Sequence, residues 1–130
     1  MKVLLPPGWP QPKGYSNAIA ARGRTIYTAG VVGWDETQHF VSDTLSGQFA
    51  QVLRNIVAIL AVDGAGPANI VRMTCYVTDR DAYVAGLAEI GAAWKAIIGP
   101  HYPAMALVEV SRLVEPAAMI EIEATAVVPE

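Results

Sequence analysis

The sequence predicts an α+β fold in which two helices pack on one face of a mixed β-sheet. Strand-like and helix-like segments follow one another in the order strands, helix, strand, helix, strands. Two segments carry apolar residues at helical spacing, so each helix buries one face. Residues 105–113 and 118–128 are two further strand candidates, joined through a connection that contains Pro116.

The first part of the chain predicts an extended arm followed by short strands. Residues 1–17 are rich in Pro and Gly, which disfavours a helix. Strands are expected over residues 18–21 and 24–31, on either side of a turn at Arg22-Gly23. A third strand candidate surrounds residues 39–41.

The first helix is predicted to begin after an N-cap at Asp43 or Thr44 and to run to about residue 63. Gly64 and Gly66-Pro67 follow it and end it. Its apolar residues recur at helical spacing and define the buried face: Phe49, Val52, Leu53, Ile56, Ile59 and Leu60.

A strand and a second helix follow. Residues 70–78 alternate, which places two rows of side chains on opposite faces. One row is Val71, Met73, Cys75 and Val77, and the other is Arg72, Thr74, Tyr76 and Thr78. Asp79 or Asp81 starts the helix, whose apolar face is Tyr83, Leu87, Ile90, Trp94 and Ile97, and Gly99-Pro100 ends it. Cys75 falls in the apolar row, so we expect a buried core thiol.

The second face of the predicted sheet is only partly polar. Seven residues are assigned to it: Arg72, Thr74, Tyr76, Glu109, Glu121, Glu123 and Thr125. Such a surface is too polar for a monomer core and too regularly patterned for a random exposed face. We therefore expect copies of the chain to bury these faces together and to leave pockets between them.

Composition restricts the class of protein. Hydrophobic residues make up 53% of the 130 residues and charged residues only 16%, which suits one self-associating domain over residues 1–130. The net charge of -3 gives no attraction to nucleic acid. The longest apolar run, residues 56–62, is too short to span a membrane. A single cysteine and no recognisable signal peptide predict a cytoplasmic protein.

The end of the chain carries two distinctive runs, Pro103-Ala104-Met105-Ala106-Leu107-Val108-Glu109-Val110 and Ile120-Glu121-Ile122-Glu123-Ala124. These runs resemble two segments of the RidA/YjgF family of reactive-intermediate imine/enamine deaminases: its Pro-Ala-Arg, small residue, Cys-Val-Glu-Val run and its Ile-Glu-Ile-Glu-Ala strand. Further motifs match in order and at family spacing. Gly14-Tyr15-Ser16-Asn17-Ala18, Ile26-Tyr27-Thr28-Ala29-Gly30 and Gln51-Val52-Leu53-Arg54-Asn55-Ile56 resemble its earlier segments.

The resemblance implies a chorismate-mutase-like fold and a homotrimer with a cleft between each pair of subunits. In the family, an enamine or imine is hydrolysed to a keto acid and ammonia with neither a metal nor an organic cofactor. Carried over to this sequence, Glu121 would position the water as the catalytic residue. The substrate would contact Tyr15, Ala29, Gly30, Met105 and Leu107.

Three of these positions depart from the family pattern. Met105 stands in place of the arginine that grips the substrate carboxylate, Leu107 in place of the cysteine, and Ala29 in place of the serine. An arginine fork makes two charge-assisted hydrogen bonds, each contributing about 1.5–3 kcal/mol. We therefore expect weak binding of short 2-imino acids such as 2-aminoacrylate. Arg72 either substitutes for the arginine or forms a structural ion pair, for instance with Glu121.

Three functions remain open at this level. The first is a hydrolase that deaminates an enamine or imine with non-standard substrate recognition, for instance an aminomuconate-like compound. The second is a non-catalytic trimer that binds a small molecule or acts like a chaperone. A ribonuclease, the third, is disfavoured by the acidic charge and by the absence of paired histidines. His39 and His101 do not have metal-ligand spacing, and Trp34 is a candidate for the pocket rim.

Overall fold

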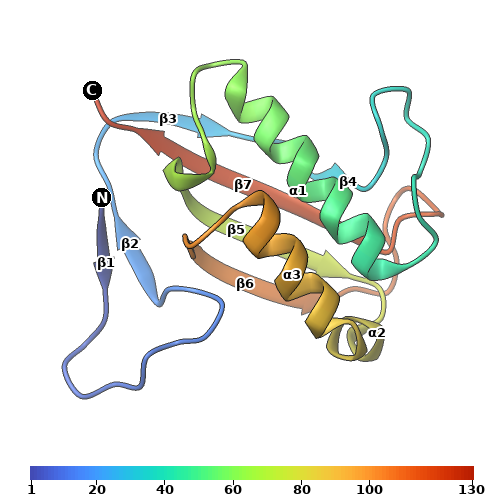
Figure 1. Cartoon of the computed structure of the whole chain (residues 1–130), viewed down its shortest axis with the longest axis horizontal. Coiled ribbons are helices and arrows are strands. Elements are labelled where there is room, and N and C mark those ends of the chain that lie inside the picture. The colour runs from blue at the N-terminus through green and yellow to red at the C-terminus, as the bar shows by residue number, and fades with distance from the viewer.

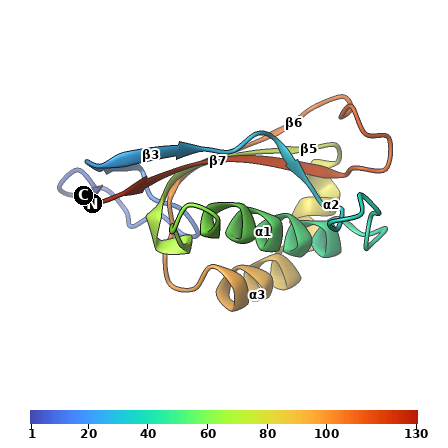
Figure 2. The same cartoon turned by 90° about the horizontal axis from the view of Figure 1, so that it is seen from above.

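The structure, a computed structural model, describes residues 1–130 and consists of a sheet with helices on one side only (Figures 1 and 2). In Figure 2, α1 and α3 lie beneath the sheet, and no helix covers the other face. This is the α+β layout that the sequence predicts. None of the helices is long and apolar enough to cross a membrane.

The main sheet has five strands, and its order is β3-β7-β5-β6, with β4 also paired to β7. The strands are β3 (Arg24–Tyr27), β4 (Val31–Val32), β5 (Ile70–Val77), β6 (Ala104–Glu109) and β7 (Ile120–Val128). β5 and β6 run parallel, and the other pairs are antiparallel, so the sheet is mixed as predicted. β6 is an edge strand, and it ends at Glu109 instead of extending to residue 113.

The helices are α1 (Leu45–Ala61), α2 (Arg80–Ala85) and α3 (Leu87–Ile97), and a short 3-10 turn, η1 (Pro67–Asn69), precedes β5. Thr44 is the N-cap of α1, and its side chain accepts a hydrogen bond from the Gly47 amide at 3.1 Å. Asp79 caps α2 in the same way. The prediction of two helices is wrong in one respect, because Gly86 divides the second into α2 and α3. Glycine has a poor helix propensity, which favours a break at this position.

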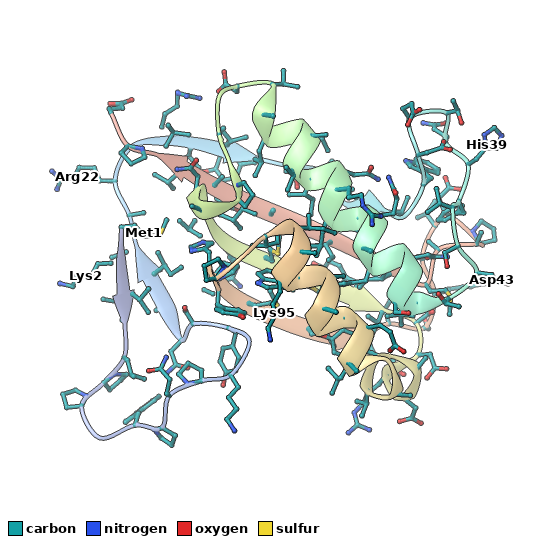
Figure 3. All side chains as sticks on the ribbon, in the orientation of Figure 1. Met1, Lys2, Arg22, His39, Asp43 and Lys95 are labelled. Carbon is teal, nitrogen blue, oxygen red and sulfur yellow. The ribbon has the colours of Figure 1, made fainter.

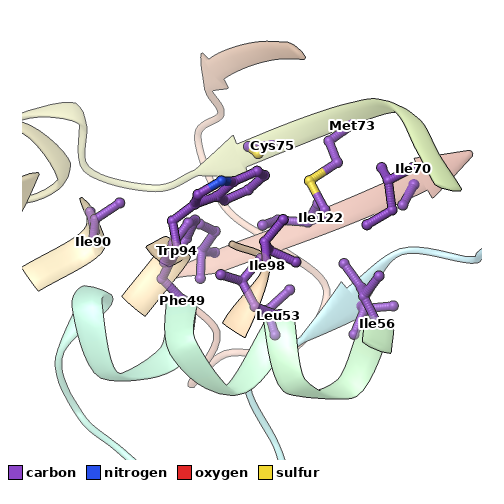
Figure 4. Packing of buried hydrophobic residues seen from close by; sticks show 14 of the residues in the cluster. Phe49, Leu53, Ile56, Ile70, Met73, Cys75, Ile90, Trp94, Ile98 and Ile122 are labelled. Carbon is purple, nitrogen blue, oxygen red and sulfur yellow. The ribbon is translucent and has the colours of Figure 1, made fainter. Parts of the chain in front are cut away.

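The core lies between the helices and the sheet (Figure 4). From α1 it receives the predicted apolar face, except that Ile59 is exposed. From the sheet it receives Met73, Cys75 and Ile122, which Figure 4 shows opposite Leu53 and Ile98. The burial of Cys75 is confirmed, and burial raises the pKa of its thiol to about 12.

One row of β5 differs from the prediction. A bulge between Ile70 and Arg72 shifts the register against β7, so Ile70 joins the buried row and Val71 is only half-buried. Beyond the bulge, alternation holds, with Met73, Cys75 and Val77 toward the helices. An extra residue in one strand reverses the side-chain order before it, which alternation alone does not reveal.

The arm is extended, as predicted, but it also contains a strand. β1 (Lys2–Leu4) pairs antiparallel with β2 (Ala18–Ala20) and forms a separate two-stranded ribbon beside the main sheet (Figure 1). The strand expected around residues 39–41 is wrong, since only one isolated bridge joins Trp34 to Phe40. The Asp35 side chain accepts hydrogen bonds from the amides of Thr37 and His39. These local hydrogen bonds stabilise a turn, so the segment does not pair as a strand.

Candidate active site

Tyr15 is held beside the start of β6 by the residue that follows it. Ser16 forms an isolated parallel bridge with Ala104, and its amide donates to the Pro103 carbonyl at 3.0 Å. The Ser16 hydroxyl also donates to the Tyr102 carbonyl. The arm is therefore fixed against the edge strand, which brings Tyr15 to the end of the sheet where β6 begins.

A pocket of about 400 Å³ opens between the arm, the helices and β6. Tyr15, Met105 and Leu107 line it, as the resemblance implies. The other lining residues come from the arm, from α1, from the two helices that follow β5 and from the segment before β6: Lys13, Gly14, Phe49, Tyr83, Leu87, Ile90, Gly91, Trp94, Lys95 and Tyr102. The walls are mostly apolar or aromatic, so the pocket suits a small organic molecule with an apolar body.

One wall of this pocket is built from aromatic rings. Trp94 and Tyr102 stack with their ring centroids 5.9 Å apart and their planes 11° from parallel. The Trp94 indole nitrogen donates to the His101 carbonyl at 3.0 Å, which fixes the ring. Tyr102 has no periodic signal in the sequence, whereas Trp94 lies on the predicted apolar face of its helix. That face forms part of the core and part of the pocket wall.

Glu121 lies on the opposite side of the sheet from Met105. In the parallel pair, Met105 is aligned with the buried Met73, and it packs against the core. In the antiparallel pair, Glu121 is aligned with Tyr76, on the face that no helix covers. Neighbouring residues on paired strands point to the same face. One chain therefore does not bring the candidate catalytic carboxylate into the pocket.

Gly30 makes room for the Glu121 carboxylate. A Cβ atom placed on Gly30 would lie only 2.5 Å from Glu121 Oε2. Gly30 directly precedes β4, which pairs with β7 at Val32 and Glu121. Glu121 is half-buried, and its side chain makes no hydrogen bond or ion pair within the chain. Its two oxygens are thus available to a water molecule or to a neighbouring molecule.

Ala29 lies beside Gly30 on the same connection between β3 and β4, and both residues are exposed. Thr28 ties this connection to β7, because its amide donates to the Ala124 carbonyl and its hydroxyl accepts from the Ala124 amide, both at 2.9 Å. Gly30 and Glu121 lie together on the open face, the face of the sheet that no helix covers, and Ala29 is next to Gly30 in the chain. Tyr15, Met105 and Leu107 line the pocket.

The remaining polar residues of the open face make few contacts. The Tyr76 hydroxyl donates to Glu123 Oε1 at 2.8 Å, and this hydrogen bond raises the pKa of Tyr76. Arg72 is exposed and forms no ion pair, so the expected pair with Glu121 is absent. Arg72 instead lines a second, smaller pocket of about 230 Å³ together with Tyr27, Thr28, Thr74, Glu123, Ala124 and Thr125.

One sequence-based placement is wrong. Glu109 is not on the open face, because it is aligned with Val77, and its carboxylate accepts a hydrogen bond from the Arg80 amide at 2.8 Å. It thereby contacts the first turn of α2, where a negative charge is favourable. Trp34 lines none of the pockets described and packs against Phe40, with ring centroids 5.7 Å apart.

The histidines lie apart and do not form a metal site. His39 is in an outer loop at one end of the molecule, where Figure 3 labels it, and its Nδ1 contacts the Thr37 hydroxyl. His101 Nε2 lies 2.6 Å from the Ile70 carbonyl oxygen. No group of three or more His, Cys, Asp or Glu side chains is arranged to hold a metal ion.

Comparison with known proteins finds relatives that match most of the chain. Residues 10–128 match the family model described as endoribonuclease L-PSP. A RutC family protein from Pyrococcus horikoshii is 35% identical over 127 residues, which cover 96% of each chain. The 2-iminobutanoate/2-iminopropanoate deaminase of Salmonella typhimurium is 33% identical over 108 residues, covering 81% of this chain and 80% of that protein.

Solved structures agree with the fold. A Rid family protein of unknown function from Yersinia pestis, YyfB, superposes with a TM-score of 0.85 at 35% identity and covers 98% of both chains. The YjgF gene product from E. coli superposes with a TM-score of 0.68 at 31% identity, with 87% of both chains covered.

Proposed function

Because the chain belongs to the RidA/YjgF family, we propose that it is a hydrolytic deaminase of an enamine or imine. The observation that carries the proposal is the free, half-buried carboxylate of Glu121 against Gly30, on a face that is otherwise uncovered. A carboxylate with no partner in its own chain is suited to orient a water molecule. Relatives that bear the name of an imine deaminase support the same chemistry.

The proposed active site forms between two copies of the chain. The pocket at the edge of one sheet contains Tyr15, Met105 and Leu107, while Glu121 and Gly30 lie on the open face. A second copy that packs its open face against the edge strand β6 would bring the two groups together. A homotrimer closed in this way has three equivalent clefts and covers the exposed apolar groups of the open side, among them Tyr27, which is 76% exposed.

In the proposed reaction, Glu121 accepts a proton from a water molecule as the water oxygen bonds to the C=N carbon. Glu121 passes this proton to the nitrogen, and a carbinolamine forms. Glu121 then takes the proton of the new hydroxyl group and gives it to the nitrogen, the C–N bond breaks, ammonia leaves and the carbon becomes a carbonyl. An enamine first takes a proton on carbon and loses one from nitrogen to become the imine. General-base help of this kind contributes about 10²–10⁴ in rate.

The pocket favours a substrate other than a short imino acid. At the three positions where this chain departs from the family pattern, Met105 and Leu107 form apolar walls and Ala29 offers no hydroxyl group. A larger unsaturated compound, such as an aminomuconate-like molecule, fits an apolar pocket of about 400 Å³ better.

Two other functions are less well supported. A non-catalytic binding or chaperone-like trimer would use the same pocket but would leave the Glu121 carboxylate without a role. A ribonuclease would bring RNA phosphates close to Glu121 and Glu123 on the open face, where repulsion opposes binding. His101 Nε2 contacts the Ile70 carbonyl and His39 lies in an outer loop, so the two histidines do not form a pair.

The test is ammonia release from imines generated freshly in solution, from 2-aminoacrylate and from 2-aminomuconate, beside an active relative as the positive control. We expect acceleration for at least one large substrate and little for 2-aminoacrylate. No acceleration for any of them would contradict the deaminase proposal and would favour the non-catalytic binding or chaperone-like trimer. Sedimentation of the same preparation tests the trimer, which a stable monomer would contradict.

A further inference from the structure

The pocket beside β6 contains two positive charges and no negative charge. Lys13 and Lys95 line it, and no aspartate or glutamate is among its 13 lining residues. The chain as a whole has three lysines and a net charge of -3. Two of its three lysines therefore lie at one pocket in a protein that is otherwise acidic.

The two lysines reach the pocket from different elements. Lys13 belongs to the arm, two residues before Tyr15, and Lys95 belongs to α3, next to Trp94. Along α3, the residues that line the pocket recur at helical spacing, and Lys95 continues this row: Leu87, Ile90, Gly91, Trp94 and Lys95. A row of this spacing faces one side of a helix, so the Lys95 stem leaves α3 on the pocket side.

Neither lysine has a partner in its own chain. The ion pairs of the structure, Arg24 with Asp63 and Arg80 with Asp81, both use arginines. Both lysines are exposed, and lysine stems can cover apolar walls while the ammonium groups remain in water. The charges are thus free to meet an anion at the mouth of the pocket.

The size of the pocket indicates what the anion is attached to. A molecule of three or four carbon atoms would leave most of the roughly 400 Å³ unfilled, and unfilled apolar space contributes no dispersion contacts. The stacked Trp94 and Tyr102 rings and the Met105 side chain offer contacts to a ring or a branched chain.

We infer that Lys13 and Lys95 bind the substrate carboxylate that position 105 does not bind, and that the substrate is an imine of a 2-oxo acid with an aromatic or large apolar side chain. The inference rests on the proposed deaminase function and specifies its substrate class. The carboxylate lies at the pocket mouth between the arm and α3. The apolar side chain lies against Trp94 and Tyr102, and the C=N group points toward the open face of a second subunit.

The binding test uses phenylpyruvate, a stable 2-oxo acid that corresponds to the product of such a reaction. Calorimetry at low salt compares it with pyruvate, which lacks the ring, and with phenylacetone, which lacks the carboxylate. We expect phenylpyruvate to bind at least about tenfold more tightly than either. Pyruvate cannot make the contacts of the ring with the apolar wall, and phenylacetone cannot make the contacts of the carboxylate with the lysines. Salt should weaken phenylpyruvate binding and leave phenylacetone binding unchanged.

Variants of Lys13 and Lys95 test whether these two side chains bind the carboxylate. K13Q/K95Q should weaken phenylpyruvate binding about tenfold and leave phenylacetone binding unchanged, whereas K13R/K95R should retain both. Lys2→Gln is the matched control, since Figure 3 shows Lys2 on the outer side of the arm, away from α3 and Lys95. Unchanged phenylpyruvate binding by K13Q/K95Q, or equally tight binding of pyruvate, would overturn the inference.

Sedimentation and ammonia release distinguish carboxylate binding by the lysines from a role in subunit assembly and from the chemistry itself. If K13Q/K95Q fails to assemble in sedimentation, the lysines pair with carboxylates of a neighbouring subunit, and the inference is wrong. Ammonia release from the imine of phenylalanine, generated by an amino-acid oxidase, tests the chemistry separately. Lysine-dependent binding of phenylpyruvate without ammonia release from any imine would contradict the deaminase proposal. Ammonia release that is unaffected in K13Q/K95Q would contradict the role of the lysines.

Discussion

The backbone of Gly30 lies directly against the side chain of Glu121, so that a Cβ on Gly30 would approach Glu121 Oε2 to 2.5 Å and Cδ to 2.8 Å. Only a residue without a side chain leaves the carboxylate where it is. Because the obstacle is the end of a flexible side chain, a methyl group at position 30 would displace the carboxylate and leave the strands in place.

We therefore expect Gly30→Ala to fold normally and to lose at least about tenfold in ammonia release. A displacement of the order of 1 Å is sufficient to misplace a catalytic group. Gly66→Ala is the control, because a Cβ on Gly66 meets nothing within 4 Å. The measurement is kcat/KM on the best imine, with circular dichroism to verify folding. Full activity of Gly30→Ala would show that the position of this carboxylate does not matter.

Replacement of the carboxylate itself should have a larger effect. We expect Glu121→Gln to reduce kcat by about 10²–10⁴, since an amide cannot accept the proton of the attacking water. The melting temperature should change little, because the Glu121 side chain has no hydrogen bond or ion pair within the chain.

Glu123→Gln is the matched control on the same face of β7. Glu123 is occupied by the Tyr76 hydroxyl, so this substitution should preserve activity. It should also remove the effect of the Glu123 charge on Tyr76 and bring the raised pKa of Tyr76 back toward its ordinary value. If Glu121→Gln and Glu123→Gln reduce activity equally, Glu121 is not the general base.

Introducing an arginine at position 105 should change the substrate range. Met105 is half-buried at the edge of the pocket, where a long arginine can extend its charged end to water. We expect Met105→Arg to improve kcat/KM for 2-aminoacrylate by about tenfold to a hundredfold, through two charge-assisted hydrogen bonds to the carboxylate. Met105→Leu should leave the low activity unchanged. If Met105→Arg leaves kcat/KM for 2-aminoacrylate unchanged, position 105 does not contact the carboxylate.

Local sequence patterns were sufficient for the helices and for the core. The Thr44 cap, the apolar face of α1 and the alternation of β5 beyond Met73 all follow from neighbours within a few residues. The apolar spacing does not predict the break at Gly86, because it continues across this residue and only the backbone shows the interruption.

The site was harder to predict, because it depends on contacts between distant segments. Met105 is aligned with Met73, and Glu121 is aligned with Tyr76. This register places Met105 and Glu121 on opposite faces of the sheet, and it cannot be derived from local sequence patterns. Lys13 and Lys95 are 82 positions apart and belong to no common motif. Only the folded arm, pinned to β6 through Ser16, brings both lysines to one pocket.

Gln48 is a buried polar side chain that supports the fold, and its loss should be costly. Its Nε2 donates to the carbonyls of Ser42 at 3.1 Å and Ala117 at 2.9 Å, and its Oε1 accepts from the Met119 amide at 2.8 Å. An apolar replacement of similar size leaves three backbone groups without partners, at about 1–3 kcal/mol each.

We therefore expect Gln48→Met to lower the free energy of unfolding by about 3 kcal/mol or more. Urea denaturation at one fixed protein concentration measures it, since assembly adds to the apparent stability. Gln51→Met is the control, because Gln51 bonds only to the Asn55 side chain on the same helix, at 2.9 Å. A Gln48→Met midpoint equal to that of Gln51→Met would show that water replaces the lost contacts.

The Cys75 thiol should be inert in the folded protein and should make stability depend on pH in the alkaline range. Burial raises its pKa to about 12, so about one thiol in ten thousand is ionised at pH 8. We expect iodoacetamide to alkylate Cys75 only after unfolding in urea. Because the folded pKa lies above the unfolded value, the contribution of this group is complete below about pH 9 and is lost as pH rises toward 12. Urea midpoints at pH 7.5 and pH 10 should therefore differ more for the parent chain than for Cys75→Ala, which lacks the titrating group. Rapid alkylation of the folded protein at pH 8, or an equal pH dependence of the two chains, would contradict the burial of the thiol.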